Sequence, residues 1–139
     1  MDKFADWHKH DKFISWTLSK LPDGSAFNKP VGLGIVKGGE ILAAVVYDNY
    51  IPACKSISFS VAVADKSAIS IRHVKNLFHF PFCVMNCQRI TNAVESTNAP
   101  SLALTKKLGF KLEAILRNAS FNNNDVHVFG MLAGECRWI

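Results

Sequence analysis

Three side chains with the chemistry of a general base stand at or beside segments with strand-like patterns. Tyr47 closes the apolar run that begins at Ile41, Glu95 follows the alternating segment RITNAV, and His127 lies within the alternating segment DVHVFGML. A phenol, a carboxylate or an imidazole can take a proton from a reacting group when it is held within hydrogen-bond reach. We therefore take Glu95, Tyr47 and His127 as candidate catalytic residues, with further candidates in their neighbours Asp48, Tyr50 and Asp125.

Cysteine usage offers a second kind of chemistry. The chain has four cysteines, Cys54, Cys83, Cys87 and Cys136, and the middle two are spaced i, i+4 as on one face of a helix. Two thiolates so placed are half of a zinc site, but no His or Cys pair of matching spacing completes four ligands, although His73 and His79 lie nearby. We expect reduced packing thiols and no metal site.

Basic residues are concentrated in one half of the chain. The formal net charge is +5, and from Lys66 to Arg117 eight Lys and Arg oppose two Glu, which gives +6 there and −1 elsewhere. Such a field favours a polyanionic ligand, whereas a solvated basic surface is the ordinary alternative. A helix is expected to start near Ser70, so backbone N–H groups after the strand SISFSVAVAD are placed to bind an anion.

The elements that would position these groups are clearest between Asn98 and Arg117, NAPSLALTKKLGFKLEAILR. Asn98 and Ser101 suit a helix start, and Pro100 suits its first turn. Gly109 follows a basic last turn and suits the left-handed conformation that ends a helix. The residues after it alternate as in a half-buried strand. We therefore predict a helix followed by a strand in this segment.

The remaining patterns predict an element order of helix, hairpin, strand, helix, strand, helix, hairpin. An amphipathic helix is expected over about 3–20, before Pro22 and Gly24, and Gly38 and Gly39 mark the turn of the first hairpin. Strand, helix and strand over about 57–96 form a βαβ unit whose helix is kinked or ended by Pro81. A helix and hairpin over about 98–132 close a single domain, residues 1–139. The Phe residues at 78, 80 and 82 are expected in its core.

The same segments resemble the Gcn5-related N-acetyltransferase (GNAT) superfamily. There an Asn after one strand leads into a short helix, and a Gly-Phe pair opens the next strand as GFxxEGxLR. The residues on that pattern are Asn98, Ser101, Leu108, Gly109, Phe110, Glu113, Leu116 and Arg117, with Ala114 at the second Gly. The resemblance begins at about residue 31 and covers most of the chain from there. The first strand that is usual in the superfamily is not evident here. At its C-terminus the chain is similar to small phage-encoded GNAT-like proteins. The resemblance implies an α/β (α+β) GNAT fold, with a mixed central sheet splayed at the cofactor site and helices on both faces.

The resemblance also implies acetyl-CoA as co-substrate and a set of cofactor-binding residues. The pantetheine arm would pair with a strand at Val61, Ala62 and Val63. The pyrophosphate would lie on the loop and helix start formed by Lys66, Ser67, Ala68, Ile69, Ser70, Ile71 and Arg72, where Ala68 and Ser70 occupy the two glycine positions of the family signature R/Q-x-x-G-x-G/A. Asn98, Ser101 and Thr105 complete the cofactor-binding set, with Thr105 at a position where the family often has Tyr.

The function implied is transfer of an acetyl group from acetyl-CoA to an amine of a small molecule or a protein. The alternative is a noncatalytic GNAT-fold protein, phage-encoded, that binds a host protein or nucleic acid through its basic half. Nucleic acid is the less favoured partner because the chain lacks a helix-turn-helix, an RNP-like motif and zinc fingers. No apolar run approaches the roughly 20 residues of a membrane span, so we expect a cytoplasmic monomer or homodimer, in the host cytoplasm if phage-encoded.

Overall fold

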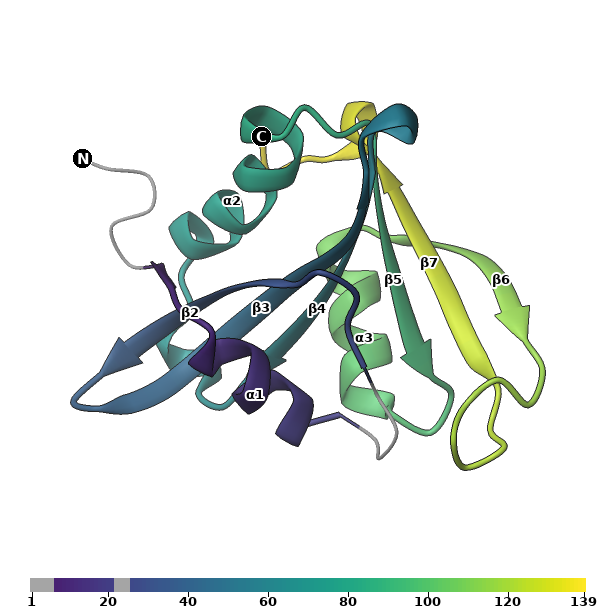
Figure 1. Ribbon diagram of the computed structural model, residues 1–139, viewed down its shortest axis with the longest axis horizontal. Helices are drawn as coiled ribbons and strands as arrows, with labels where there is room; N and C mark the ends of the chain where they lie inside the picture. The colour runs from purple at the N-terminus through teal and green to yellow at the C-terminus, as the bar shows by residue number, and fades with distance from the viewer. Residues whose placement is uncertain (1–6, 22–25) are drawn as a thin grey trace.

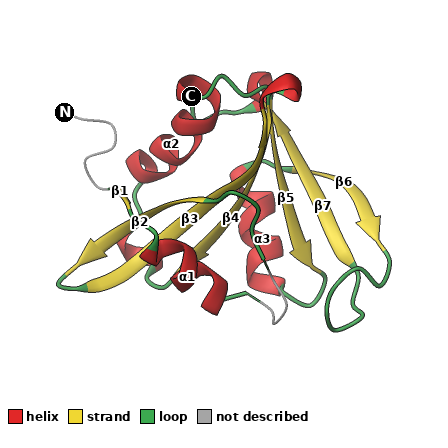
Figure 2. Ribbon diagram, viewed as in Figure 1, coloured by secondary structure: helices red, strands yellow, loops and turns green. Residues whose placement is uncertain are grey.

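The protein, described over residues 7–21 and 26–139 by a computed structural model, is built on a seven-stranded mixed sheet with helices on both faces (Figures 1 and 2). The strands run in the order β1-β2-β3-β4-β5-β7-β6 across the sheet. Their bounds are β1 (His8–Lys9), β2 (Val31–Lys37), β3 (Glu40–Ile51), β4 (Ser56–Val63), β5 (Arg89–Glu95), β6 (Lys111–Leu116) and β7 (Val126–Leu132).

The three α-helices of the described residues are divided between the two faces of the sheet. Helix α1 (Lys12–Ser19) packs on β2 and β3, so closely that a Cβ added at Gly34 would lie 2.2 Å from the ring of Phe13. Helices α2 (Ile71–His79) and α3 (Ala99–Leu108) cover the other face. There the Tyr47 hydroxyl of β3 donates to the carbonyl of Leu77 in α2, at 2.5 Å. These contacts define an α1 face and an α2/α3 face of the sheet.

The β4–β5 pair is the one parallel pair of the sheet, and it separates along its length. Its register extends only from Ser56 opposite Arg89 to Ser58 opposite Thr91. Beyond Ser58, β4 remains paired with β3, and β5 remains paired with β7 over all of Arg89–Glu95. In Figure 1 the two strands diverge from their paired ends. The predicted splay of the sheet therefore lies between β4 and β5, with the open end toward Val63 and Glu95.

Aromatic side chains fill the α2/α3 face. The ring of Phe59 on β4 lies 5.2 Å from Phe110 and 5.8 Å from Phe78, which is completely buried. After His79 the chain leaves the α-helix and makes a π-helical turn, η3 (Phe80–Val84), in which Pro81 and Phe82 are also buried. A Pro cannot continue the hydrogen-bond ladder, so the predicted break in this helix is confirmed, and the apolar turn seals the core.

The beginning of the chain differs from the prediction of a helix over 3–20. Residues 8–9 form the short strand β1 beside β2, and α1 starts only at Lys12; Phe4, Pro22 and Gly24 lie outside the described residues. Trp7 explains the change, because its indole is buried and its Nε1 donates to the backbone carbonyl of His73, at 3.2 Å. Trp7 is thus anchored to α2 on the opposite face from α1, and the residues that follow it, His8 and Lys9, run along the sheet edge beside β2.

The predicted helix between Asn98 and Gly109 is confirmed at both ends. Asn98 accepts a hydrogen bond from the backbone N–H of Ser101, and Gly109 adopts φ +106°. The side-chain cap satisfies a donor that the helix itself cannot, and the positive φ strongly favours glycine. Local sequence signals thus fix the position of α3 beneath the splay.

The cysteines are free thiols, with Cys54 and Cys83 exposed and Cys87 and Cys136 buried. Burial raises the pKa of both buried thiols, which keeps them protonated and unreactive. Within residues 7–21 and 26–139, no helix has the length and apolar character needed to cross a membrane.

Candidate active site

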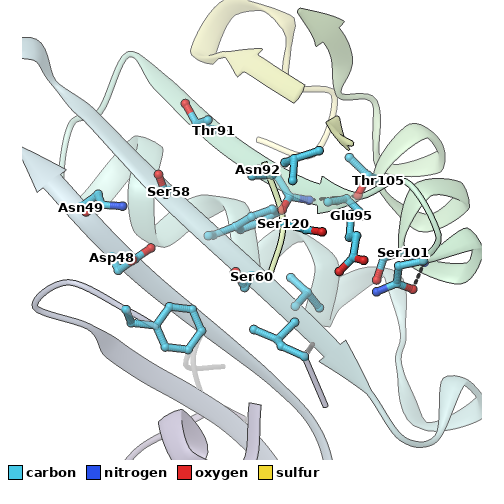
Figure 3. A pocket seen from close by; sticks show the side chains of 18 of the residues that line it. Asp48, Asn49, Ser58, Ser60, Thr91, Asn92, Glu95, Ser101, Thr105 and Ser120 are labelled. Carbon is cyan, nitrogen blue, oxygen red and sulfur yellow. Dashed lines mark hydrogen bonds between the residues drawn. The ribbon is translucent and has the colours of Figure 1, made fainter. Parts of the chain in front are cut away.

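A cavity of about 440 Å³ occupies the splay between β4 and β5 (Figure 3). Residues directly opposite one another share a face of the sheet, so the register places Asp48, Ser58 and Thr91 in one row on the α1 face. Glu95 lies on this face too, four residues beyond Thr91. Asn98, Ser101 and Thr105 line the cavity from α3 on the opposite face. Because the strands separate here, one cavity is accessible to groups from both faces.

Of the three leading catalytic candidates, Glu95 lines this cavity, whereas Tyr47 and His127 do not; Asp48, one of the further candidates, lines it too. The side chain of Glu95 is 9% exposed, and Oε1 accepts hydrogen bonds from Asn124 Nδ2 at 2.7 Å and Thr97 Oγ1 at 3.3 Å. Oε2 has no hydrogen-bond partner within the described part of the chain. The β6–β7 loop thus fixes one oxygen of the carboxylate and leaves the other able to accept a proton.

Asp48 lies at the other end of the cavity. It is 6% exposed, and its Oδ2 accepts a hydrogen bond from the backbone N–H of Asn28 at 3.1 Å. Burial raises the pKa of this carboxyl above its ordinary value, and the Asn28 N–H opposes part of the rise. In Figure 3, Asp48, Asn49, Ser58 and Thr91 lie on one side of the cavity, while Glu95, Ser101 and Thr105 lie on the other.

The three residues predicted on α3 are brought together at the cavity. Asn98 serves as the helix cap, while Thr105 Oγ1 accepts a hydrogen bond from Asn92 Nδ2 of β5 at 2.9 Å. Both partners of this second bond are buried, so it fixes the distance between α3 and β5. Because the Thr105 hydroxyl accepts that bond, it still has its own proton to donate.

The segment Val61–Val63 forms the end of β4 that the splay exposes. Each of the three residues is paired with β3, from Val45 opposite Val61 to Ala43 opposite Val63. On the other edge β5 has already diverged, so this strand edge has main-chain groups without a strand partner among the described residues. Such an edge can accept an extended chain as an additional strand. Val61 also lines the cavity; Ala62 and Val63 do not.

The predicted pyrophosphate loop lies beyond the open end of β4, outside the cavity. Lys66–Ala68 form a 3₁₀ turn, η2, with Ile69 following it, and α2 starts at Ile71. Two of its backbone donors have internal acceptors: the N–H of Ser67 donates to Asp65 Oδ1 at 3.0 Å, and that of Ser70 donates to His73 Nδ1 at 3.0 Å.

The first turn of α2 lies at the positive end of the helix dipole, with the backbone N–H of Ile71 at its start. Lys66 and Arg72 add positive charge to the same region. Acetyl-CoA therefore fits this structure well at its pantetheine end, where an open strand edge borders the cavity, and less well at its phosphate end.

The structure does not bring Tyr47 and His127 to the cavity. The Tyr47 ring is fully buried, its hydroxyl bonds to α2, and burial raises its pKa well above the ordinary value. His127 lies on β7 with its ring 6.3 Å from that of Phe129, and its buried Nδ1 has no hydrogen-bond partner in the described chain. Their catalytic roles stay predictions, which the geometry favours less than that of Glu95. Asp125 accepts from the N–H of Asn118 outside the cavity, and Tyr50 is exposed.

Sequence reasoning missed the hydroxyl groups of the cavity. Ser58 and Ser60 of β4 and Thr91 of β5 line it on the α1 face. The signal was present in SISFS, where every second residue is Ser while Ile57 and Phe59 enter the core. This strand has one apolar face and one face rich in hydroxyl groups, and no helix covers half of the hydroxyl-rich face within the described residues. Such a pattern indicates a surface that binds a polar ligand.

All ionisable side chains that line the cavity within the described residues are acidic, namely Asp48 and Glu95. The predicted basic groups of the phosphate loop lie outside it. No group of three or more His, Cys, Asp or Glu that could hold a metal ion occurs in residues 7–21 and 26–139. The chemistry of the cavity is thus that of proton acceptance and hydrogen bonding near two carboxylates.

Comparison with known proteins identifies the fold. No protein-family model matches the sequence, and no curated protein matches it. The structure is similar to a chimera of the *Vibrio cholerae* spermidine N-acetyltransferase SpeG and hSSAT, with a TM-score of 0.74 and 14% identity over 91% of this chain and 95% of that one. It is also similar to the dodecameric *V. cholerae* spermidine N-acetyltransferase, with a TM-score of 0.72 and 15% identity over 92% and 94% of the two chains.

A third similar structure is a probable GNAT-family acetyltransferase from *Chromobacterium violaceum*, with a TM-score of 0.65 and 22% identity over 89% of this chain and 66% of that one. The chain therefore has the GNAT fold, as its sequence predicts. Nothing in these similarities bears on a phage origin or a cytoplasmic location, and both stay predictions.

Proposed function

We propose that the protein is an N-acetyltransferase that binds acetyl-CoA along the open edge of β4 and transfers its acetyl group to an amine in the cavity. The observation that carries this proposal is the splay itself. It combines a strand edge at Val61–Val63 that has no strand partner among the described residues, a cavity accessible from both faces, and a buried carboxylate, Glu95, of which one oxygen is oriented and the other has no partner in the same part of the chain. The similar structures described as acetyltransferases support the same activity.

Acetyl-CoA supplies an activated acetyl thioester. The attack of an uncharged amine nitrogen forms the C–N bond, the C–S bond breaks, and the nitrogen loses one proton. Glu95 Oε2 accepts that proton, while Asn124 and Thr97 hold Oε1 in place. Backbone N–H groups at the open edge of β4 are positioned to stabilise the negative charge that develops on the carbonyl oxygen. The Thr105 hydroxyl, oriented by Asn92, can donate toward the departing sulfur, which is a tolerable leaving group as a thiolate.

The test is release of free thiol from acetyl-CoA over a panel of amines, peptides and polyamines. Glu95→Gln keeps an acceptor for Asn124 but loses the base, so turnover should fall roughly 10²- to 10⁴-fold with little change in acetyl-CoA affinity. Tyr47→Phe and His127→Asn test the two remaining predictions, and Glu40→Gln, an exposed residue of the β2–β3 hairpin, is the matched control. A wild-type chain that binds acetyl-CoA but releases no thiol with any acceptor would contradict the proposal.

A second candidate function is that of a noncatalytic GNAT-fold protein that binds a protein or nucleic acid. The observation that favours it is the phosphate loop, where Asp65 and His73 accept the Ser67 and Ser70 N–H bonds. Absence of both acetyl-CoA binding and thiol release, together with a retained fold, is the result that this candidate predicts.

A further inference from the structure

The ionisable side chains that line the cavity are acidic, whereas the chain as a whole has a net positive charge. The formal net charge of the protein is +5, yet the ionisable residues that line the cavity are two carboxylates. The polar side chains that line it on the α1 face include the hydroxyls of Ser58, Ser60 and Thr91, which can accept hydrogen bonds as well as donate them. Such a cavity attracts cations and repels anionic acceptors.

The two carboxylates are separated within the cavity. Asp48 is in register with Ser58, and Ser58 with Thr91, so Asp48 lies in a row that crosses the sheet at the level of Thr91. Glu95 is four residues farther along β5, which corresponds to roughly 13 Å of extended strand. One acceptor amine cannot contact both groups. The row between them is lined by Ser60 and Ala93, without a cationic side chain.

The two carboxylates also differ in how they are held. Glu95 borders the open edge of β4 and α3, where the proposed acetyl transfer takes place. Asp48 lies away from that end, and a hydrogen bond to Asn28 orients its Oδ2 while Oδ1 has no partner among the described residues. The Asn28 contact alone would not require a charge, since the amide oxygen of an Asn would accept the same bond. The structure therefore places a buried carboxyl group, with one oxygen oriented by the backbone, at the far end of the cavity.

We infer that the acceptor is a dication with two separated amines, of which one is acetylated beside Glu95 while Asp48 binds the other. This inference rests on the proposed function and specifies its substrate class. The ammonium group beside Glu95 first loses one proton to solvent, which gives the uncharged nucleophile, and the nitrogen loses a second proton to that carboxylate as the C–N bond forms and the C–S bond breaks. The second amine stays protonated and donates charge-assisted hydrogen bonds to Asp48 and to the hydroxyl of Ser58 or Thr91.

The experiment compares 1,6-diaminohexane with 1-aminohexane, which has the same chain length and one amine. Calorimetric binding to the full chain is measured first, because it needs no catalysis, and KM for thiol release is measured second. A charge-assisted contact of the second amine should make the diamine bind about tenfold or more tightly than the monoamine. Shorter diamines, such as 1,3-diaminopropane, should lose this advantage because they cannot reach both carboxylates.

Asp48→Asn is the decisive variant because it retains an acceptor for the Asn28 N–H and removes only the charge. The preference for the diamine should disappear in this variant and persist in Glu40→Gln, which removes a charge outside the cavity. Equal binding of the two amines by the wild type, or an unchanged preference in Asp48→Asn, would overturn the inference.

The outcomes also separate this inference from the proposed function. Thiol release that is equally efficient with monoamine and diamine would support acetyl transfer and overturn the dication. A diamine preference that depends on Asp48, without thiol release, would support the binding site and refute the transfer reaction.

Discussion

The cavity between β4 and β5 and the loop that follows β4 adjoin the same strand, but their polar groups differ in how they are hydrogen-bonded within the protein. In the cavity, one oxygen of Glu95 and one of Asp48 accept hydrogen bonds from the protein, while the other oxygen of each carboxylate has no hydrogen-bond partner within the described residues. In the loop, Asp65 and His73 accept hydrogen bonds from the backbone N–H groups of Ser67 and Ser70.

This difference indicates which end of the site is suited to contact a ligand. Buried polar groups in native proteins generally have hydrogen-bond partners, so a buried carboxylate oxygen without one among the described residues is a candidate contact for a ligand. Internal partners instead make the loop stable without one. We therefore expect the thioester and acceptor end of the site to contribute more to binding than the phosphate end.

The largest effect is expected from filling the cavity. Ala93 of β5 lines it on the α1 face and is itself exposed, so a Phe at this position would occupy the cavity without displacing core side chains. Ala93→Phe should weaken acetyl-CoA binding about 100-fold or more, which corresponds to about 2.7 kcal/mol. Calorimetry checks this, with Ala93→Ser as the control. Equal affinity in both variants would show that the ligand binds outside the splay.

A second prediction concerns the wall that holds the cavity open. In Thr105→Val the buried Asn92 amide loses its acceptor, which should reduce the free energy of unfolding by about 1–3 kcal/mol. Thr105→Ser keeps the hydroxyl and should cost less. Urea denaturation measures both. A Val variant as stable as the wild type would mean that this hydrogen bond does not fix α3 against β5.

In the loop that follows β4, removing a charged group should strengthen acetyl-CoA binding rather than weaken it. Asp65→Asn keeps an acceptor for the Ser67 N–H but removes a negative charge beside the proposed phosphate site. Acetyl-CoA should then bind about two- to fivefold more tightly, an effect typical of exposed charges, and high salt should reduce the gain. S-acetylpantetheine, which lacks the phosphates, should show no change. Weaker acetyl-CoA binding in Asp65→Asn would show that the loop needs this carboxylate.

The smallest effect is the pH dependence that Asp48 brings to stability. Burial raises the pKa of the Asp48 carboxyl above its ordinary 3.8, so folding favours the protonated form. The contribution of this carboxyl to the free energy of unfolding is therefore fully present below pH 3.8 and is lost as the pH rises through the folded-state pKa. Asp48→Asn should therefore raise the Tm slightly at pH 7, and the gain should shrink as the pH falls toward 4. A gain that is independent of pH would assign it to packing rather than charge.

The sequence predicted the elements whose signals are local and missed the relations set by strand register. The Asn98 cap and the Gly109 stop located α3 because both act within a few residues. The faces of Tyr47 and Glu95 could not be read, since they depend on pairing with Phe59 and Val126, far along the chain. Tyr47 therefore emerged as a candidate base, although the register turns it into the core.

Long-range contacts also explain the other misses. Trp7 was assigned to a helix, but its hydrogen bond to the carbonyl of His73, 66 residues away, places it at the sheet edge. The internal bond from the Ser70 N–H to His73 Nδ1 had no sequence signal beyond the three-residue spacing. Residue types predicted an anion site in this loop, whereas the geometry shows that part of the site already has internal partners.

Calorimetric titration of the wild-type chain with acetyl-CoA is the most direct test of a ligand site in the splay. We predict saturable heat at concentrations up to about 1 mM, the upper range of enzyme affinities, and a rise in Tm because the ligand binds the native state. No heat and no Tm shift at that concentration, from a chain that unfolds cooperatively, would contradict the assignment of the cavity to acetyl-CoA.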